Sequence, residues 1–213
     1  MASANSYARR VKPSLWRPTP ARLIQLVVGL WLFGTGDAML IAATLGNSPW
    51  TVLAEGAAKH TPVGIGTATI VISFIVLLIW IPLRQRPGLG TLMNAIVIGL
   101  AIAVMLPVLP DDPSDVMRWA LLAFGIALVA IGSGFYLTAQ LGPGPRDGLM
   151  TGLHRRTGLS LRLVRFGIEG GATALGFALG GRVGIGTLAF AVLIGPAVQA
   201  AVKLLWAGDT REL

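Results

Sequence analysis

Two proline-containing breaks in an otherwise apolar chain, a first at 45–50 and a second at 141–148, carry the side chains best suited to bind a polar solute. The second break places Arg146 and Asp147 directly after its proline, where the first break has Trp50 and Thr51. A guanidinium group binds anions through charge-assisted hydrogen bonds, and a nearby carboxylate can serve as a gate or a proton acceptor. The residues expected to form a substrate-binding site are Ser48, Trp50, Gly144, Arg146, Asp147, Arg162, Arg165 and Glu169.

Three of these residues share one helix face, because Arg162, Arg165 and Glu169 are spaced by three, four and seven positions. Glu169 lies about two turns inside an apolar stretch, where an unpaired carboxylate is costly. Two interpretations are open. In the first, Glu169 pairs with Arg165 or Arg146 and holds helices together. In the second, Arg146 and either Arg162 or Arg165 clamp an anionic solute, with Asp147 or Glu169 as the gate or proton acceptor.

Each break leads into a short helical segment. Glycine before the break and proline at Pro49 and Pro145 are typical of a helix start. The segments that follow, 49–60 and 145–157, are too short to cross a bilayer. They are either amphipathic helices at the membrane surface or re-entrant half-helices that dip from opposite sides. Re-entrant helix starts would bind anionic or strongly polar groups.

Asp37 lies roughly four turns inside the first apolar stretch, at the position that Ser133 occupies in the second half of the chain. A carboxylate at that depth needs a partner. We expect Asp37 to tether a helix N-terminus rather than to relay protons. Other polar side chains in apolar stretches are expected to cross-link helices rather than to bind substrate, and these are Asn94, Thr138, Gln140 and Gln199.

No residues combine into a catalytic set. The chain has no cysteine, and its histidines, His60 and His154, are expected on opposite sides of a membrane. Neither a metal-ligand spacing nor a nucleophile motif occurs. Two Gly-x-Gly-Thr-Leu motifs lack the strand and lysine of a phosphate loop, so we expect them to begin helices, with Thr91 and Thr187 in the first turn. We therefore expect no enzyme activity, catalytic residue, cofactor or metal site.

The composition indicates an all-α membrane protein. Of the 213 residues, 54% are hydrophobic and 12% are charged, and the mean hydropathy is +0.74. Such a chain has too little polar surface to cover a soluble domain. Six mostly apolar stretches are long enough to cross a bilayer as helices: 23–44, 66–83, 91–109, 117–140, 163–179 and 187–206.

The sequence is duplicated, because residues 22–101 recur about 96 positions later as 118–197. Three apolar stretches in each copy would invert one copy relative to the other, a plan common in transporters and channels. The predicted fold is a six-helix membrane bundle of two inverted three-helix repeats, each with a short interrupted or re-entrant helix. The predicted parts are a basic N-terminal arm at 1–21, repeats at 22–110 and 118–206, an acidic external loop at 111–117 and a C-terminal tail at 207–213.

The positions of the basic residues predict an orientation. With the N-terminus in the cytoplasm, only Lys59, Arg118 and Arg182 of the 17 lysines and arginines fall outside. Both termini are therefore expected on the cytoplasmic side. The net charge of +8 also attracts anionic lipid headgroups. No nucleic-acid partner is expected, because the basic patches lack interleaved aromatic residues and any module signature.

Several motifs carry a resemblance to a known family. Leu141-Gly142-Pro143-Gly144-Pro145-Arg146-Asp147-Gly148-Leu149-Met150, Arg156-Thr157-Gly158 with Arg165 and Glu169, and 180–187 resemble the bacterial YczE/YyaS/YitT-like integral membrane proteins, closest to the YczE-like branch. The likeness covers nearly the whole chain apart from the basic arm and the last few residues. It implies a multi-pass protein of the bacterial cell (inner) membrane and supplies no catalytic or binding residues.

Together these features predict a small-solute transporter or channel that binds a polar or anionic solute between the two breaks. The alternative is a membrane accessory or scaffold protein that supports an export or biosynthetic complex. The expected partners are membrane lipids, the solute, and either a second copy of the chain or a membrane complex. A transporter requires a polar cavity between the breaks, whereas a scaffold predicts a closed and well-packed centre.

Overall fold

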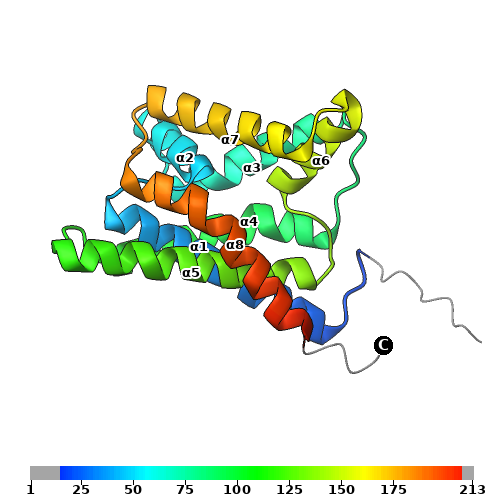
Figure 1. The fold of residues 1–213 in the computed structure, drawn as a ribbon, viewed down its shortest axis with the longest axis horizontal. Helices are drawn as coiled ribbons and strands as arrows, with labels where there is room; N and C mark the ends of the chain where they lie inside the picture. The colour runs from blue at the N-terminus through cyan, green and yellow to red at the C-terminus, as the bar shows by residue number, and fades with distance from the viewer. Residues whose placement is uncertain (1–14, 208–213) are drawn as a thin grey trace, which may run out of the picture.

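The computed structural model describes residues 15–207, and all of the regular secondary structure in this part of the chain is helical (Figure 1). Residues 1–14 of the predicted basic arm and 208–213 of the predicted tail lie outside the described residues. The helices are α1 (Pro20–Ala43), α2 (Pro49–Lys59), α3 (Ile65–Trp80), α4 (Leu89–Met105), the 3-10 helix η1 (Leu106–Val108), α5 (Asp115–Thr138), α6 (Pro145–Thr157), α7 (Leu161–Ala178) and α8 (Ile185–Ala207).

A helix lies over each of the six predicted apolar stretches, but these helices differ in their fitness to cross a bilayer. Four are long and apolar enough: α1, α4 together with η1, α5 and α8. Helix α3 is apolar but has only 16 residues, about 24 Å of rise against a hydrocarbon core of about 30 Å. Helix α7 has 18 residues and carries Arg162, Arg165 and Glu169. The fold is therefore that of a helical membrane protein with several apolar helices.

The duplication in the sequence extends to the backbone. Helices α2, α3 and α4 begin at residues 49, 65 and 89, and α6, α7 and α8 begin at 145, 161 and 185. Left-handed backbone conformations recur at the same spacing, with Thr44 matched by Gln140 and Gly46 by Gly142. Both Gly-x-Gly-Thr-Leu motifs begin helices, as predicted, because α4 starts at Leu89 and α8 at Ile185.

The two halves meet along α1 and α5, which pack through glycine. A Cβ atom on Gly29 would lie 2.9 Å from the Gly132 carbonyl oxygen, and one on Gly36 would lie 2.6 Å from the Gly125 carbonyl oxygen. The residue numbers rise along α1 as they fall along α5, so the helices run antiparallel. Small residues let helix backbones approach closely where side chains would keep them apart.

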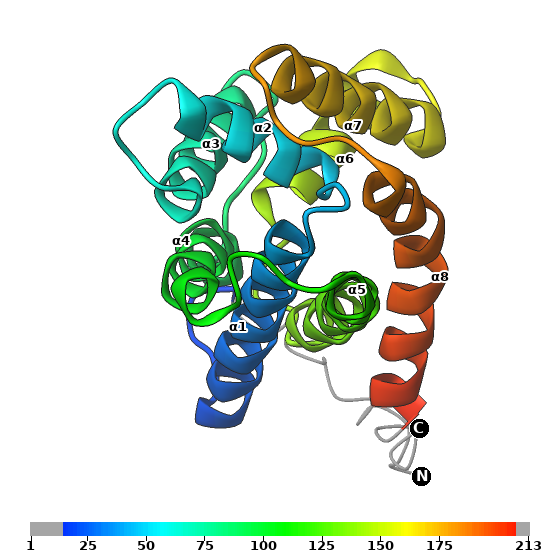
Figure 2. The same ribbon diagram turned by 90° about the vertical axis from the view of Figure 1, so that its left-hand side faces the viewer.

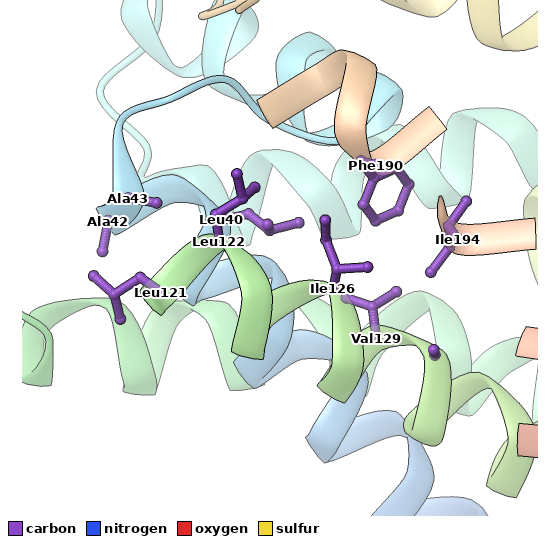
Figure 3. Close-up of a cluster of buried hydrophobic side chains, with 10 residues drawn as sticks. Leu40, Ala42, Ala43, Leu121, Leu122, Ile126, Val129, Phe190 and Ile194 are labelled. Carbon is purple, nitrogen blue, oxygen red and sulfur yellow. The ribbon is translucent and has the colours of Figure 1, made fainter. Parts of the chain in front are cut away.

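Buried apolar side chains fill the space on one side of this pair. Leu40 of α1, Ile126 and Val129 of α5, and Phe190 and Ile194 of α8 belong to one cluster (Figure 3). Figure 2 shows α8 lying beside α5 on one side of α1, with α4 on the other side. The second layer consists of α2, α3, α6 and α7, in which the short helices α2 and α6 each contact both α3 and α7.

Arg22 ties the start of α1 to the end of α5. Its Nε donates to the Ala139 carbonyl oxygen at 2.9 Å, and its Nη2 donates to the Gln140 carbonyl oxygen at 3.1 Å. A cation at a helix C-terminus satisfies carbonyls that have no partner within the helix.

Arg22→Ala should therefore destabilise the purified protein by about 1 to 2 kcal/mol. The measurement is the thermal unfolding midpoint in detergent, with Arg86→Ala, an exposed arginine, as the control. An Arg22→Ala midpoint equal to that of the control would refute this tethering role.

Candidate functional site

The two breaks are held in place by reciprocal contacts between the halves. The Gly186 N–H donates to the Leu45 carbonyl oxygen at 2.8 Å, and the Gly90 N–H donates to the Leu141 carbonyl oxygen at 2.8 Å. Each break thus rests on the Gly-x-Gly-Thr-Leu motif of the other half. The glycines of these motifs permit the approach, since a Cβ atom on Gly186 would lie 2.6 Å from the Gly46 carbonyl oxygen.

The threonines of the two motifs play unequal parts. Thr91 Oγ1 accepts a hydrogen bond from the Gly88 N–H at 3.0 Å and donates one to the Pro143 carbonyl oxygen at 2.7 Å. Thr187 Oγ1 accepts from the Gly184 N–H at 3.3 Å. Thr91 therefore fixes the second break directly, in addition to closing its own helix turn.

Thr91→Val should consequently cost about 1 to 3 kcal/mol of stability, and Thr187→Val should cost less. Both side chains are buried, so the pair of substitutions compares like with like. Thermal unfolding of the two purified variants measures the difference. Equal midpoints would show that the bond to Pro143 contributes nothing.

The starts of α2 and α6 meet at the centre of the molecule. The Arg146 guanidinium lies over the Trp50 ring, 5.1 Å from its centroid, which is a cation–π contact. These residues occupy equivalent positions in the two halves, so they meet where the halves face each other. Trp50 is buried and Arg146 is partly buried. The helix starts are therefore enclosed by protein rather than laid on a surface.

Acidic side chains surround Arg146. Asp147 accepts a short hydrogen bond from the Tyr136 hydroxyl, and Asp37, Asp147 and Glu169 all act on the Arg146 guanidinium through their charge. One arginine among three carboxylates leaves an excess of negative charge, which Arg165 on the cavity wall offsets in part. Such a set can hold a group that carries both signs of charge or that forms several hydrogen bonds.

Asp37 has an unusual environment. It is fully buried beside the Ser48 and Thr51 hydroxyls, which share a hydrogen bond 2.8 Å long. Among the described residues, neither Asp37 carboxyl oxygen has a partner with hydrogen-bond geometry. Arg146 supplies the opposite charge that acts on it. Asp37 thus lies beside the start of α2, but no hydrogen bond joins it to that helix, so its role as a tether stays a prediction.

A cavity of about 300 Å³ lies where the breaks meet. Side chains of α1, α4, α5, α7 and α8 contribute to its wall along with the starts of α2 and α6. Polar and apolar groups alternate around it, with Asn94, Ser133, Tyr136 and Gln199 among the polar ones. Its volume suits a small polar molecule or a headgroup-sized part of a larger one.

The structure gathers most of the predicted site residues around this cavity. Seven lie on its wall: Ser48, Trp50, Gly144, Arg146, Asp147, Arg165 and Glu169. Arg162 lies elsewhere, because its side chain is exposed near the start of α7 and does not line the cavity. Arg165 Nε donates to Glu169 Oε1 at 2.9 Å, which is the intrahelical pair of the structural interpretation.

Sequence reasoning missed Tyr136 as a site residue and assigned Asn94 and Gln199 to helix cross-links. The duplication offered a signal in each case. Tyr136 stands where the first half has Leu40, and Asn94 stands where the second half has Phe190. Polar residues that replace apolar ones between two copies of a fold mark positions that packing alone does not require.

A second polar cluster supports the first break from outside the cavity. Buried Glu55 accepts hydrogen bonds from Asn47 Nδ2 and from the Arg182 N–H, both at 2.7 Å. Lys59 Nζ lies 3.6 Å from Glu55 Oε1 and donates to the Gly180 carbonyl oxygen at 2.5 Å. These contacts fix α2 to the loop before α8, and they serve packing.

The apolar helices and the polar cavity together define an all-helical membrane protein. Comparison with known sequences gives its family: residues 20–203 match the family of unknown function DUF6198. The chain belongs to this family, and the resemblance to YczE- and YyaS-like proteins expected from the sequence motifs is confirmed.

Three relatives cover most of the chain. An uncharacterized protein of Haemophilus influenzae is 42% identical over 87% of this chain and 85% of its own length. The uncharacterized membrane protein YczE of Bacillus subtilis is 32% identical over 82% of this chain and 79% of its own length. The uncharacterized protein YyaS of Bacillus subtilis is 30% identical, over 76% and 82% respectively. No solved structure matches the chain significantly.

Proposed function

We propose that this protein moves a small polar solute across the bacterial inner membrane through the cavity between the two breaks. The observation that carries the proposal is the meeting of Trp50 and Arg146 beside a cavity lined by charges of both signs. Helix starts present unpaired N–H groups, and irregular backbone within a membrane is tolerated where it lines a cavity or is buried in protein. In this proposal α2 and α6 are re-entrant helices, and both chain termini are cytoplasmic.

Reciprocal contacts support an inverted duplication of the two halves. Gly29 packs on Gly132, and Gly36 packs on Gly125. Gly29 and Gly125 are equivalent positions in the two halves, as are Gly36 and Gly132, so exchanging the halves converts one contact into the other. Such exchange is the mark of a two-fold axis. An axis in the membrane plane would place the solute site near the middle of the bilayer, as in many transporters.

The charges around the cavity favour a solute that is polar or zwitterionic over a simple anion. Arg146 and Arg165 contribute positive charge to the wall, and Asp147 and Glu169 contribute negative charge. A simple anion would meet two carboxylates for every two guanidinium groups. A zwitterion can pair with both signs at once.

Solute flux into proteoliposomes tests the proposal. The panel consists of urea, glycine, phosphoethanolamine and acetate, and stopped-flow light scattering reports their entry. We expect faster entry of at least one zwitterion than in protein-free vesicles, and a loss of about tenfold or more in Arg146→Gln. Arg86→Gln, the control at an exposed arginine, should match the natural protein. Entry of every solute at the protein-free rate would contradict the proposal.

A further inference from the structure

The two halves differ in how they close the space beside the cavity. In the first half, α3 and α4 pack closely, and a Cβ atom on Gly99 would lie 2.5 Å from the Gly66 carbonyl oxygen. The equivalent positions in the second half are Arg162 and Gly195. A Cβ atom on Gly195 would have no other heavy atom within 4 Å. Within the described residues α7 and α8 scarcely touch, and Figure 2 shows them lying apart.

The reason lies in what each helix packs against. Helix α7 packs on α2 and α6, whereas α8 packs on α5. Pro196 interrupts the hydrogen bonding of α8, where the first half has Leu100 in α4. A proline inside a helix bends it. The α7–α8 seam, defined here by Arg165 and Glu169 on α7 and by Gly195 and Gln199 on α8, is therefore a part of the cavity wall where the described parts of the two helices pack little against each other.

The seam opens toward the outside of the protein. Arg165 is 48% exposed and Glu169 34% exposed in their side chains, although both also line the cavity. Their neighbours on the outer surface are apolar: Phe166 on α7 and Val192 on α8 are 78% and 70% exposed. An apolar outer surface beside α8, one of the four membrane-length helices, faces lipid.

We propose that the cavity opens sideways to the lipid through the α7–α8 seam, and that the transported solute is an amphiphile with a small zwitterionic headgroup and one apolar chain. This inference rests on the proposed function. The headgroup occupies the cavity of about 300 Å³ and pairs with charges of both signs. The apolar chain passes through the seam and stays in the lipid. The Arg165–Glu169 pair lies on the rim and exchanges its mutual bond for bonds to the headgroup.

Filling the seam at Gly195 tests the inference. Gly195→Leu places a bulky side chain in open space, so the variant should fold. The matched control is Gly170→Leu, because Gly170 also lies in open space on a helix but does not line the cavity. Two probes are compared in proteoliposomes: radiolabelled lysophosphatidylethanolamine, whose movement between leaflets is followed by back-extraction with albumin, and soluble phosphoethanolamine, whose entry is followed directly.

The expected result is accelerated movement of both probes by the natural protein. Gly195→Leu should slow the lysolipid by about tenfold and should slow it more than it slows phosphoethanolamine, while Gly170→Leu changes neither. Phosphoethanolamine entry without lysolipid movement would overturn the sideways opening and leave the proposed function standing. Equal lysolipid movement in Gly195→Leu and the natural protein would also overturn it. Movement of neither probe above protein-free vesicles would overturn both proposals.

Discussion

Replacing Gly46 with alanine should remove most of the folded protein. Gly46 has φ 113°, a left-handed conformation in which side chains are strained, and its added Cβ would lie 2.5 Å from the Gly184 nitrogen and 2.7 Å from Thr187 Oγ1. Neither of these two atoms is at the end of a long flexible side chain that could move away. The first break would therefore have to shift away from the Gly-x-Gly-Thr-Leu motif of the other half. We expect a loss of at least about 4 kcal/mol in stability.

The duplication provides the comparison for this prediction. Gly142→Ala should also destabilise strongly, though less than Gly46→Ala, since φ is 116° and the nearest atom, Thr91 Oγ1, would lie 2.9 Å away. Gly170→Ala should be neutral or slightly stabilising, because an added Cβ meets nothing there and alanine favours a helix. Fluorescence-detected gel filtration and thermal unfolding in detergent measure all three. Wild-type yield and stability of Gly46→Ala would contradict the interlocked arrangement of the breaks.

Arg146→Gln is the second substitution with a large expected effect, and it should be partly rescued by Asp37→Asn. Asp37 is fully buried, and Arg146 supplies the positive charge that acts on it. Because Arg146 is only partly buried and no hydrogen bond joins it to Asp37, removing its charge should cost less than the roughly 3 to 5 kcal/mol of a broken buried ion pair. With both members neutral, the double variant should recover about 2 kcal/mol relative to the sum of the single variants.

A double-mutant cycle in the purified protein measures this coupling through thermal or chemical unfolding. The control cycle combines Asp37→Asn with Arg86→Gln, an exposed arginine outside the cavity wall, and should be additive within about 0.5 kcal/mol. Additivity of Asp37→Asn and Arg146→Gln would show that the two charges do not depend on each other. In that case Arg146 would balance Asp147 and Glu169 alone.

Local signals in the sequence predicted the helices and their starts well. Proline after glycine or serine marked the starts of α2 and α6, and the Gly-x-Gly-Thr-Leu motifs marked those of α4 and α8. These features depend on residues within one turn of each other, so a single copy of the sequence contains them.

Contacts between the two halves could not be predicted from short sequence motifs. The glycines of the Gly-x-Gly-Thr-Leu motifs were expected only to begin helices, but they also seat the opposite break, as the Gly90–Leu141 bond shows. Arg162 shares the spacing of Arg165 and Glu169, yet it lies near the start of α7, before the helix reaches the cavity. Helical spacing predicts which face of a helix a residue occupies, but not which turns of that helix line a cavity.

The charge balance of the site could not be predicted from the sequence, because it depends on which charged residues lie near one another in the folded protein. The expected site residues included three arginines and two carboxylates, but Asp37, which acts on Arg146, comes from a helix that lies far earlier in the chain. With Arg162 outside the cavity and Asp37 beside Arg146, the set of charges is less cationic than the sequence suggested. The proposal of a zwitterionic rather than an anionic solute rests on this mixed set of charges.

Thiol labelling tests the central claim, a small water-accessible cavity enclosed between the two breaks, most directly. The chain has no cysteine, so Ser48→Cys and Met150→Cys each introduce a single thiol on the cavity wall, one in each half. In membranes both thiols should react with a small hydrophilic methanethiosulfonate and neither should react with a polyethylene-glycol maleimide. Reaction of both thiols with the bulky maleimide would show that the two breaks lie on the protein surface. Failure of both thiols to react with the small reagent would show that no water-accessible cavity separates the breaks. Either result would contradict the account.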